Sequence, residues 1–384
     1  MSKQIRILFP DQIHQKKLTG GFLRTFNLAK LSSKEFQTYI FGISETEGYK
    51  KKLDGISLVQ EKKYNNKLEK LKHYSEGLFS ENYSLMTSKK AFIDFNPEKT
   101  VFQIEGPLAY NLLKKRKINN YVLDEHNVYW EFSEFPNFDF KSRIYNKLAS
   151  KRDKKLEINA LKNATHILAC SDRDKQVMIK EVPESEGKIT VIPNCVNTEE
   201  YGNYLKIENV ENSFKVLFVG LLSYQPNTDA VNSICKIIAP KCNENVEFII
   251  AGNNPPAIKN KPKNVKFLGY VEDLKKCISE ADICIAPLRY GSGTRFKILE
   301  YMAMQKPIIS TSKGAEGINY TNNKNIIIED NIANFIIIIE DLLKDEMRRN
   351  QLGKEARKLV KDTYNWQIYK KTLNNIYNEV LNAD

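Results

Sequence analysis

Residues 286–317 read APLRYGSGTRFKILEYMAMQKPIISTSKGAEG, and this stretch decides the fold and the kind of ligand. A glycine-flanked turn leads into an amphipathic helix, with Thr294 as the expected N-cap and Arg295 and Lys297 in the first turn. Glycines let a backbone approach a ligand closely, and a helix N-terminus beside two cations suits a pyrophosphate. Glu300 follows one turn later, where its carboxylate can accept hydrogen bonds from ribose hydroxyls.

This stretch lies in a chain that alternates strand-like and helix-like segments throughout. We expect strands at residues 5–9, 38–41, 101–104, 121–124, 166–170 and 190–192, and again at 215–219, 246–251, 265–268, 282–286, 307–309 and 325–328. Residues 43–98 are polar and lysine-rich, and no element is assigned there. Because such alternation is typical of parallel sheets with crossover helices, we predict an α/β protein with two doubly wound Rossmann-like domains that face each other across a cleft.

The same pattern predicts where the domains begin and end. A chain of 384 residues suits two domains better than one. We place a first domain at residues 1–195, a linker at 196–213 and a second domain at 214–365. Residues 332–343 combine strand propensity with helical apolar spacing, and we predict a helix. In residues 366–384 the apolar side chains share one helical face, which predicts an amphipathic helix docked on the protein.

The composition limits the class of protein and its partners. Hydrophobic residues make up 41% of the chain, no apolar run is long enough to span a membrane, and the N-terminus enters a strand pattern directly, so we expect a cytoplasmic location. The net charge is +12, with basic clusters at residues 50–52, 62–72, 114–117 and 141–155. These clusters are either solvated surfaces or peripheral contacts for anionic lipid headgroups or a lipid-linked phosphate at the inner face of the membrane. No nucleic-acid-binding motif accompanies them, so we expect no nucleic acid partner.

Two further candidate features lie in the first half. Gly20 and Gly21 follow the first strand and open a helix expected at residues 21–31, so their amides can approach an anion, although an ordinary loop would have the same sequence. His126 follows the strand at 121–124, where doubly wound domains place ligand-binding residues. It can hydrogen-bond a sugar hydroxyl or a phosphate, although lone histidines are often structural.

Together these motifs resemble the retaining glycosyltransferases of family 4, which have the GT-B fold. The likeness is most specific at residues 291–300, GSGTRFKILE, which are similar to a G-x-G-T-R-x-K-x-L-E signature. GYVED at 269–273, VIPNCV at 191–196 and DEHN at 124–127 resemble further blocks of that family. Residues 366–384 are similar to the family's helix that crosses back to the first domain.

The resemblance implies a nucleotide-sugar donor that the second domain binds. Glu300 would hold the ribose, and the backbone at Tyr270 and Val271 would frame the base. Ser171 and Asn194 would line the cleft.

The resemblance also implies which groups contact the phosphates and the sugar. Arg295 and Lys297 would neutralise the pyrophosphate, and His126 would contact the donor sugar. Four backbone amides would approach the phosphates or the sugar, those of Gly20, Gly21, Gly293 and Thr294. No metal and no other cofactor are expected, because two cations and helix dipoles can take the place of an ion.

The sequence departs from the family pattern at two places. Ser292 stands where many members have the first of two glutamates, so the motif does not identify the sugar. Residues 220–227, GLLSYQPN, lack the Arg and Lys that many members have there. We therefore assign the phosphate cations to Arg295 and Lys297.

The implied reaction is the transfer of a sugar, with retention of anomeric configuration, from the nucleotide-sugar donor to a saccharide, a lipid-linked molecule or a protein. The implied setting is the biosynthesis of cell-surface polysaccharide or glycoconjugate. Three alternatives stay open: a non-catalytic partner subunit that binds nucleotide sugar, a nucleotide-sugar epimerase, and a protein that binds lipid surfaces.

Overall fold

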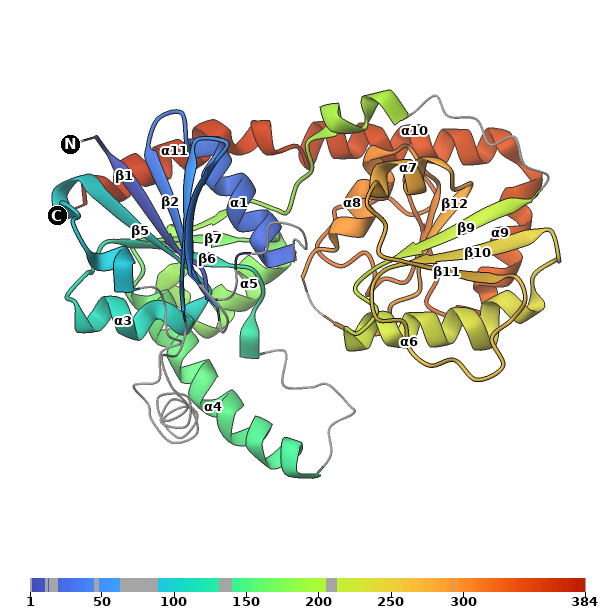
Figure 1. Cartoon of the computed structure of the whole chain (residues 1–384), viewed down its shortest axis with the longest axis horizontal. Coiled ribbons are helices and arrows are strands. Elements are labelled where there is room, and N and C mark those ends of the chain that lie inside the picture. The colour runs from blue at the N-terminus through green and yellow to red at the C-terminus, as the bar shows by residue number, and fades with distance from the viewer. Residues whose placement is uncertain are drawn as a thin grey trace. The chain divides into compact units, whose positions relative to one another are not determined.

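The computed structural model describes residues 2–10, 13, 20–44, 48–62, 89–130, 140–204, 213–291 and 293–383, and for residue 89 and residues 140–150 it describes the backbone alone. The chain forms two compact units (Figure 1). Unit 1 comprises residues 1–193 and 366–384, and unit 2 comprises residues 194–365. The C-terminal segment therefore belongs to the same unit as the N-terminus.

Unit 1 contains, in its described residues, an eight-stranded sheet in the order β3-β4-β2-β1-β5-β6-β7-β8. Its strands are β1 (Gln4–Leu8), β2 (Gln37–Ser44), β3 (Tyr49–Leu53), β4 (Ile56–Lys62), β5 (Thr100–Glu105), β6 (Tyr121–Glu125), β7 (His166–Ala169) and β8 (Ile189–Val191). Neighbouring strands are parallel except β3, which pairs antiparallel with β4 at the sheet edge. Without β3, the strand order is that of a Rossmann sheet with one added strand, and it reverses direction between β1 and β5.

The helices of unit 1 include the C-terminal helix. They are α1 (Gly20–Ser32), α3 (Tyr110–Lys115), α4 (Phe140–Asn163), α5 (Asp172–Glu181) and α11 (Trp366–Leu381). The apolar face predicted for α11 is buried, and its Asn374 Oδ1 accepts a hydrogen bond of 2.8 Å from Ser32 at the end of α1. Tyr377 packs edge-on against Phe36, with 5.7 Å between the ring centroids. These contacts make α11 part of the core of unit 1.

Unit 2 has the Rossmann strand order itself. Its described residues form a six-stranded parallel sheet in the order β11-β10-β9-β12-β13-β14, which reverses between β9 and β12. The strands are β9 (Phe214–Val219), β10 (Val246–Ala251), β11 (Val265–Gly269), β12 (Ile283–Ala286), β13 (Ile308–Ser310) and β14 (Ile327–Ile328). The helices are α6 (Gln225–Ser233), α7 (Leu274–Ser279), α8 (Phe296–Ala303), α9 (Phe335–Lys344) and α10 (Glu346–Thr363).

The predicted fold class of two doubly wound α/β domains is confirmed. Every expected strand is present, with ends that differ by up to three residues, and residues 332–343 are helical as predicted. The unassigned stretch 43–98 contains β3 and β4, which the sequence analysis missed; residues 63–88 lie outside the described part. The lysines of this stretch obscure the strand pattern in the sequence. β3 is an edge strand with three exposed lysines, whereas β4 beside it is largely buried.

Part of the predicted linker packs as ordered structure. Thr198–Tyr204 form a short 3-10 helix within unit 2, where Tyr201 is buried. Residues 205–212 lie outside the described residues. Among the described helices, none is both long and apolar enough to cross a membrane.

Candidate functional site

Two clusters of polar side chains lie where ligands bind in doubly wound sheets. Such sheets bind ligands beyond the carboxyl ends of their strands, at the point where the strand order reverses. The unit 2 cluster follows β9 and β12 and consists of Gly220, Asn227, Arg295, Lys297 and Glu300. The unit 1 cluster follows β5 and β6, faces the start of α1, and consists of Gly21, Arg24, Thr25, Glu105, Asp124 and His126.

Lys297 occupies the centre of the unit 2 cluster. Its Nζ donates a hydrogen bond of 2.8 Å to Asn227 Oδ1 and lies 4.2 Å from the ring centroid of Phe218. Gly220 makes room for this arrangement, since a Cβ at that position would lie 3.0 Å from the Lys297 ammonium and 2.7 Å from the Asn227 amide nitrogen. The ammonium thus has an oriented position directly beyond β9.

The surroundings of the two unit 2 cations disfavour their charge. Burial lowers the pKa of Lys297 well below its usual value, the positive charge of Arg295 lowers it further, and Glu300 opposes this in part. Burial also lowers the pKa of the Arg295 guanidinium, which hydrogen-bonds with Tyr224. An anion bound between these two cations would favour the charged form of both.

Glu300 lies one turn along α8 from Lys297. Burial raises its pKa to about 7, although Lys297, Lys275 and a hydrogen bond with Tyr201 oppose that shift. Tyr201 comes from the predicted linker, and its ring also lies 5.2 Å from Lys275 Nζ. The Glu300 carboxyl therefore titrates near neutral pH and is hydrogen-bonded to the Tyr201 hydroxyl. Its oxygens can also accept hydrogen bonds from a bound ligand.

The loop before α8 differs from the prediction at the helix start. We predicted Thr294 as the N-cap, but α8 begins at Phe296 and Arg295 occupies the capping position without a side-chain capping bond. Thr294 stays in the loop, because its backbone carbonyl accepts a hydrogen bond of 3.3 Å from Asn194 Nδ2. The buried Thr294 hydroxyl has no hydrogen-bond partner among the described residues.

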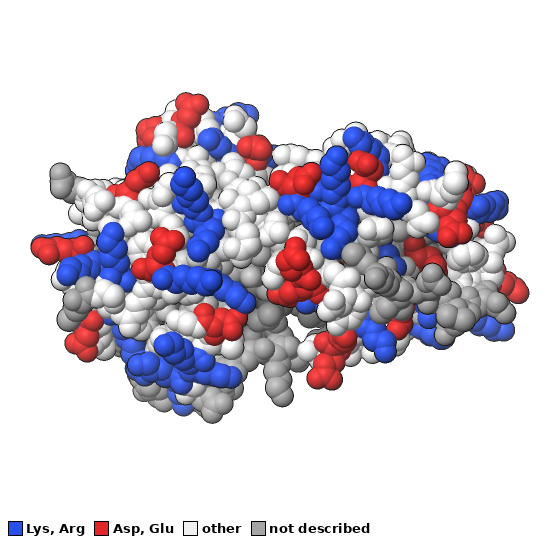
Figure 2. Space-filling model, turned by 90° about the horizontal axis from the view of Figure 1, so that it is seen from above, with Lys and Arg blue, Asp and Glu red and all other residues white. Residues whose placement is uncertain are grey.

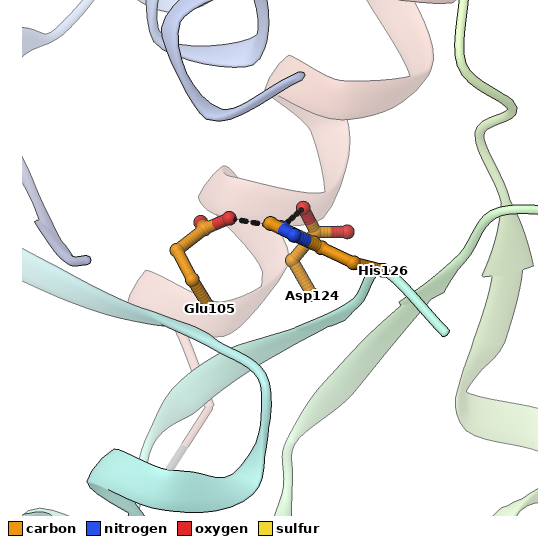
Figure 3. Close-up of side chains that lie close together, drawn as sticks. All are labelled: Glu105, Asp124 and His126. Atoms are coloured by element: carbon orange, nitrogen blue, oxygen red, sulfur yellow. Dashed lines mark hydrogen bonds and ion pairs between the residues drawn. The ribbon is translucent and has the colours of Figure 1, made fainter. Parts of the chain in front are cut away.

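His126 is the centre of the unit 1 cluster, where it lies against two carboxylates (Figure 3). Its Nε2 is 2.5 Å from Glu105 Oε2 and 3.2 Å from Asp124 Oδ2. Burial alone would lower the pKa of His126, but its hydrogen bonds to Asp124 and Glu105 raise that pKa to about 9. The imidazole is therefore positively charged at neutral pH.

Both carboxylates are held by further partners. Arg24 forks onto Asp124, with Nη2 2.7 Å from Oδ1 and Nε 2.9 Å from Oδ2, and keeps the pKa of that carboxyl below its usual range despite its burial. Thr25 donates a hydrogen bond of 2.6 Å to Glu105 Oε2. The other oxygen of Glu105 accepts a hydrogen bond of 2.6 Å from Gln103 Nε2. The side-chain oxygen of Gln103 in turn accepts a hydrogen bond of 2.5 Å from the Tyr377 hydroxyl of α11. A chain of hydrogen bonds thus links the C-terminal helix to the His126 ring.

The second ring nitrogen of His126 faces the start of α1. A Cβ at Gly21 would lie 3.1 Å from His126 Nδ1, so the glycine lets the helix backbone approach the ring. Since Nε2 is engaged by the carboxylates, Nδ1–H is the donor that a ligand near the α1 N-terminus would meet. The side chain of His126 is 12% exposed, which leaves the ring edge accessible.

Glu105, Asp124 and His126 also have the composition of a metal site, with ligand atoms within 4.8 Å of one another. The geometry fits hydrogen bonding better than metal binding. A histidine must be neutral to ligate a metal, whereas these carboxylates keep His126 protonated. Arg24 also occupies both oxygens of Asp124. A metal would have to displace a proton and compete with a buried guanidinium.

Comparison with known proteins places the unit 2 cluster, and Glu105, Asp124 and His126 of the unit 1 cluster, in matched segments. Residues 213–345 match the model for "Glycosyl transferases group 1", and residues 97–200 match the model for "Glycosyltransferase Family 4". These matches identify residues 97–200 and 213–345 as glycosyltransferase domains, and the chain has the GT-B fold. A sucrose-phosphate synthase from Thermosynechococcus elongatus shares the fold, with a TM-score of 0.72 and 14% identity over 100% of both chains. HepE of Anabaena, solved with UDP and glucose, has a TM-score of 0.65 and 14% identity over 100% of both chains.

The chain also resembles a curated relative in sequence. An Escherichia coli UDP-Gal:alpha-D-GlcNAc-diphosphoundecaprenol alpha-1,3-galactosyltransferase is 24% identical over 237 residues, which make up 55% of this chain and 59% of the relative. The alignment therefore spans about three fifths of that relative's length.

The structure brings together some of the predicted site residues. Arg295, Lys297 and Glu300 share the unit 2 cluster, and Asn194 supports the loop beside it. Two predicted residues follow the edge strand β11, Tyr270 with 56% of its side chain exposed and Val271.

Other predicted residues are found in unit 1 or outside the described part. Gly20 and Gly21 start α1 beside His126, whereas Ser171 caps α5. The Ser171 hydroxyl accepts a hydrogen bond of 3.1 Å from the backbone amide of Asp174 and donates one of 2.8 Å to the Asp174 carboxylate. These bonds stabilise the N-terminus of α5. Gly293 lies in the loop before α8, and Ser292 lies outside the described residues.

Several residues that complete the clusters were not predicted from the sequence. Glu105 ends a buried strand without any motif, and Arg24 meets Asp124 from a hundred residues away in sequence. Asn227 was quoted as part of residues 220–227 but was given no role. The signal for Asn227 was its place in the first turn of the helix after β9, where doubly wound domains gather ligand contacts.

Proposed function

We propose that this protein is a glycosyltransferase that moves a sugar from a nucleotide-sugar donor to an acceptor, with retention of anomeric configuration and without a metal ion. The observation that carries the proposal is the pair Arg295 and Lys297 beyond β9 and β12, with Glu300 one turn along. Burial lowers the pKa of both groups, and the charge of Arg295 lowers the pKa of Lys297 further, so a bound anion would stabilise the charged forms. A nucleoside diphosphate supplies that anion together with ribose hydroxyls for Glu300.

The same pair accounts for catalysis. When the bond between the anomeric carbon and the diphosphate lengthens, negative charge grows on the departing phosphate oxygens. Lys297 and Arg295 stabilise this charge more strongly than they stabilise the intact donor, which is the condition for rate acceleration. Their low-dielectric position strengthens the effect.

The unit 1 cluster supports retention through an attack on the leaving-group face. His126 can donate Nδ1–H to an oxygen of the donor sugar or of the leaving phosphate. Glu105 and Asp124 are occupied by His126, Thr25 and Arg24, which makes them poor nucleophiles for a covalent intermediate. We therefore propose that the acceptor hydroxyl attacks directly and that the departing phosphate oxygen takes its proton.

The acceptor that we propose is a saccharide linked through diphosphate to a polyprenol. The Escherichia coli relative is named for such an acceptor, a GlcNAc-diphosphoundecaprenol. The net charge of +12 favours a phosphate-bearing acceptor and peripheral contact with an anionic membrane. This acceptor would place the reaction at the cytoplasmic side of polysaccharide or glycoconjugate assembly.

The decisive assay incubates the protein and a prenyl-diphosphate-linked saccharide with a panel of nucleotide sugars, UDP sugars first. We expect release of nucleoside diphosphate, full activity in EDTA, and an NMR spectrum in which product and donor share the anomeric configuration. An inverted product would contradict the retaining mechanism, and loss of activity in EDTA would contradict metal independence. Nucleotide binding with no turnover across the panel would favour a partner subunit, and an epimer formed without acceptor would favour an epimerase.

A further inference from the structure

A basic pocket opens in unit 1 between α3 and α4, which lie outside both clusters. Its volume is about 350 Å³, at the small end of the range for ligand sites. Lys114 of α3 and Lys151, Arg152 and Lys155 of α4 line it, and no Asp or Glu belongs to its described lining. The pocket joins two basic runs of the sequence, 114–117 and 141–155, that the chain keeps far apart.

The arrangement of the pocket is that of a binding site rather than of scattered surface charge. Tyr110 and Leu156 are buried at its floor, while Lys114, Lys151 and Lys155 are exposed. On the face seen in Figure 2 the exposed charge is mixed, with Asp and Glu side chains between groups of Lys and Arg. The pocket concentrates charge of one sign around a partly apolar floor.

The ion pairs of the lining leave a positive charge for a ligand. Arg152 is paired with its neighbour Asp153 at 2.7 Å. Among the described residues, Lys114 and Lys151 form no ion pair. Positions 151, 152 and 155 lie on one face of α4, so the helix itself aligns these cations towards α3. Even with Arg152 neutralised, the ammonium groups of Lys114 and Lys151 keep positive charge in the pocket, which Lys155 also lines.

We propose that this pocket binds the diphosphate that links the lipid and the saccharide of the acceptor. The ammonium groups of Lys114 and Lys151 match the two negative charges of a diphosphate diester, and the apolar floor suits the first carbons of a prenyl chain. This inference rests on the proposed function, since it names the site of the proposed acceptor. The pocket binds the acceptor through its anion and does not take part in the chemistry.

The test is lysine acetylation footprinting of the whole chain by mass spectrometry, with farnesyl diphosphate as the probe. A saturating nucleoside monophosphate keeps the unit 2 cluster occupied without supplying a diphosphate that the pocket itself could bind. At a probe concentration ten times its dissociation constant, acetylation of Lys114, Lys151 and Lys155 should slow by about tenfold. The exposed lysines 50–52 of β3 are the internal control and should be unaffected. Equal protection of both groups, or none at the pocket, would overturn the proposal.

A matched pair of variants tests the same site by affinity. The triple variant Lys114→Gln, Lys151→Gln, Lys155→Gln removes three charges from the pocket, and should raise the dissociation constant of farnesyl diphosphate by about tenfold or more. The triple variant of lysines 50–52 to Gln removes the same charge from β3 and should change it less than about twofold. Similar losses in both variants would show that only net charge matters and would overturn the site.

Two further probes separate the sources of the anion. Inorganic pyrophosphate should protect the pocket lysines, whereas protection by phosphatidylglycerol vesicles but not by farnesyl diphosphate would identify a headgroup site and overturn the proposal. Nucleoside diphosphate binding is measured on the same preparations by thermal shift. If the pocket lysines are protected but no nucleoside diphosphate binds, the proposed function is wrong and the pocket assignment stands. If nucleoside diphosphate binds but the pocket lysines are not protected, the pocket assignment alone is wrong.

Discussion

The two clusters surround their cations in opposite ways. In unit 1, Arg24 lies 2.7 Å from Asp124 and His126 lies 2.5 Å from Glu105, so each positive group has a buried carboxylate as partner. In unit 2, the Lys297 ammonium meets a neutral amide oxygen at 2.8 Å. Among the described residues, no carboxylate lies within ion-pair distance of that ammonium.

This difference assigns different tasks to the two units. A cation that already has its counter-charge can orient a hydrogen bond to a sugar, but it gains little from a second anion. A buried cation without one loses stability in the free protein and recovers it when a phosphate binds. We therefore propose that the carboxylates of unit 1 belong to a hydrogen-bonding site and that Lys297, with its neutral partners, belongs to an anion site.

The largest effect is expected from Lys297→Met, which keeps the volume of the side chain and removes its charge. Turnover should fall by about 100-fold or more, as when one preorganised group that stabilises an oxyanion is lost. The melting temperature should stay level or rise, because the variant no longer buries a charge. The matched control is Lys276→Ala, an exposed lysine of α7, which should leave turnover unchanged. Near-normal turnover in Lys297→Met would remove the anion site from the mechanism.

A smaller loss is expected from His126→Gln, which keeps a hydrogen-bond donor for Glu105 but loses the charge. Turnover should fall by about 10- to 100-fold, the worth of a hydrogen bond from a charged group. Binding of nucleoside diphosphate should change little, because that task belongs to unit 2. If binding and turnover fell together, the division of tasks between the units would be wrong.

The pH dependence of turnover tests the charge on His126 directly. Its pKa of about 9 is raised, so the charged ring persists below that value and is lost as the pH rises through about 9. Glu105→Gln removes a carboxylate that raises this pKa, and should move the alkaline limb of the kcat profile to lower pH. A limb in the same place for both proteins would assign that limb to another group.

Glu300→Gln should weaken nucleotide binding by about tenfold, because a charged acceptor for ribose is lost. A 2′,3′-dideoxy nucleotide is the control, since it should bind both proteins equally. The pKa of Glu300 is raised to about 7, so the wild-type preference for ribose should grow as the pH rises through that value. Equal losses with both nucleotides would show that Glu300 acts on something other than ribose.

The smallest effect is a change of thermal stability, and it is expected from Glu125, one of the buried carboxyls of unit 1. Neither oxygen of buried Glu125 has a hydrogen-bond partner among the described residues, and burial with the nearby charges of Glu157 and Asp124 raises its pKa well above the usual value. Folding must therefore keep it protonated, which costs stability as the pH rises above the ordinary carboxyl pKa. Glu125→Gln should raise the melting temperature by about 2–4 °C at pH 8 and by almost nothing at pH 4.

Glu157→Gln is the matched control for that prediction. Glu157 is also buried, but it accepts hydrogen bonds of 2.9 Å and 3.2 Å from the amides of Tyr129 and Trp130. Its charge strengthens those bonds, so this variant should melt at a lower temperature. If both variants shifted the melting temperature in the same direction, the contrast between a satisfied and an unsatisfied carboxyl would fail.

Local signals were strong enough to predict the fold and half of the site. Strands buried on both faces appear as short apolar runs, and the Rossmann order of unit 2 follows from their alternation with helices. Arg295, Lys297 and Glu300 lie within six positions of one another, so their proximity followed from helical spacing. β3 was not predicted, because an edge strand can expose its lysines and still pair through its backbone.

The remaining partners could not be predicted because they meet only in three dimensions. Arg24 and Asp124 are a hundred positions apart, and Tyr377 reaches Gln103 from the C-terminal helix. Tyr201 falls in a stretch that the sequence makes look like a linker. Such contacts are set by how helices and loops pack on the sheets, which a single sequence does not encode in any local pattern.

The most direct test of the central claim is calorimetry with a nucleoside diphosphate and its monophosphate. The ratio of their two dissociation constants isolates the second phosphate. The wild-type protein should prefer the diphosphate by about tenfold or more. Lys297→Met should lose most of that preference, and His126→Gln should keep it. An unchanged preference in Lys297→Met, or an equal loss in both variants, would contradict the assignment of the anion site to unit 2.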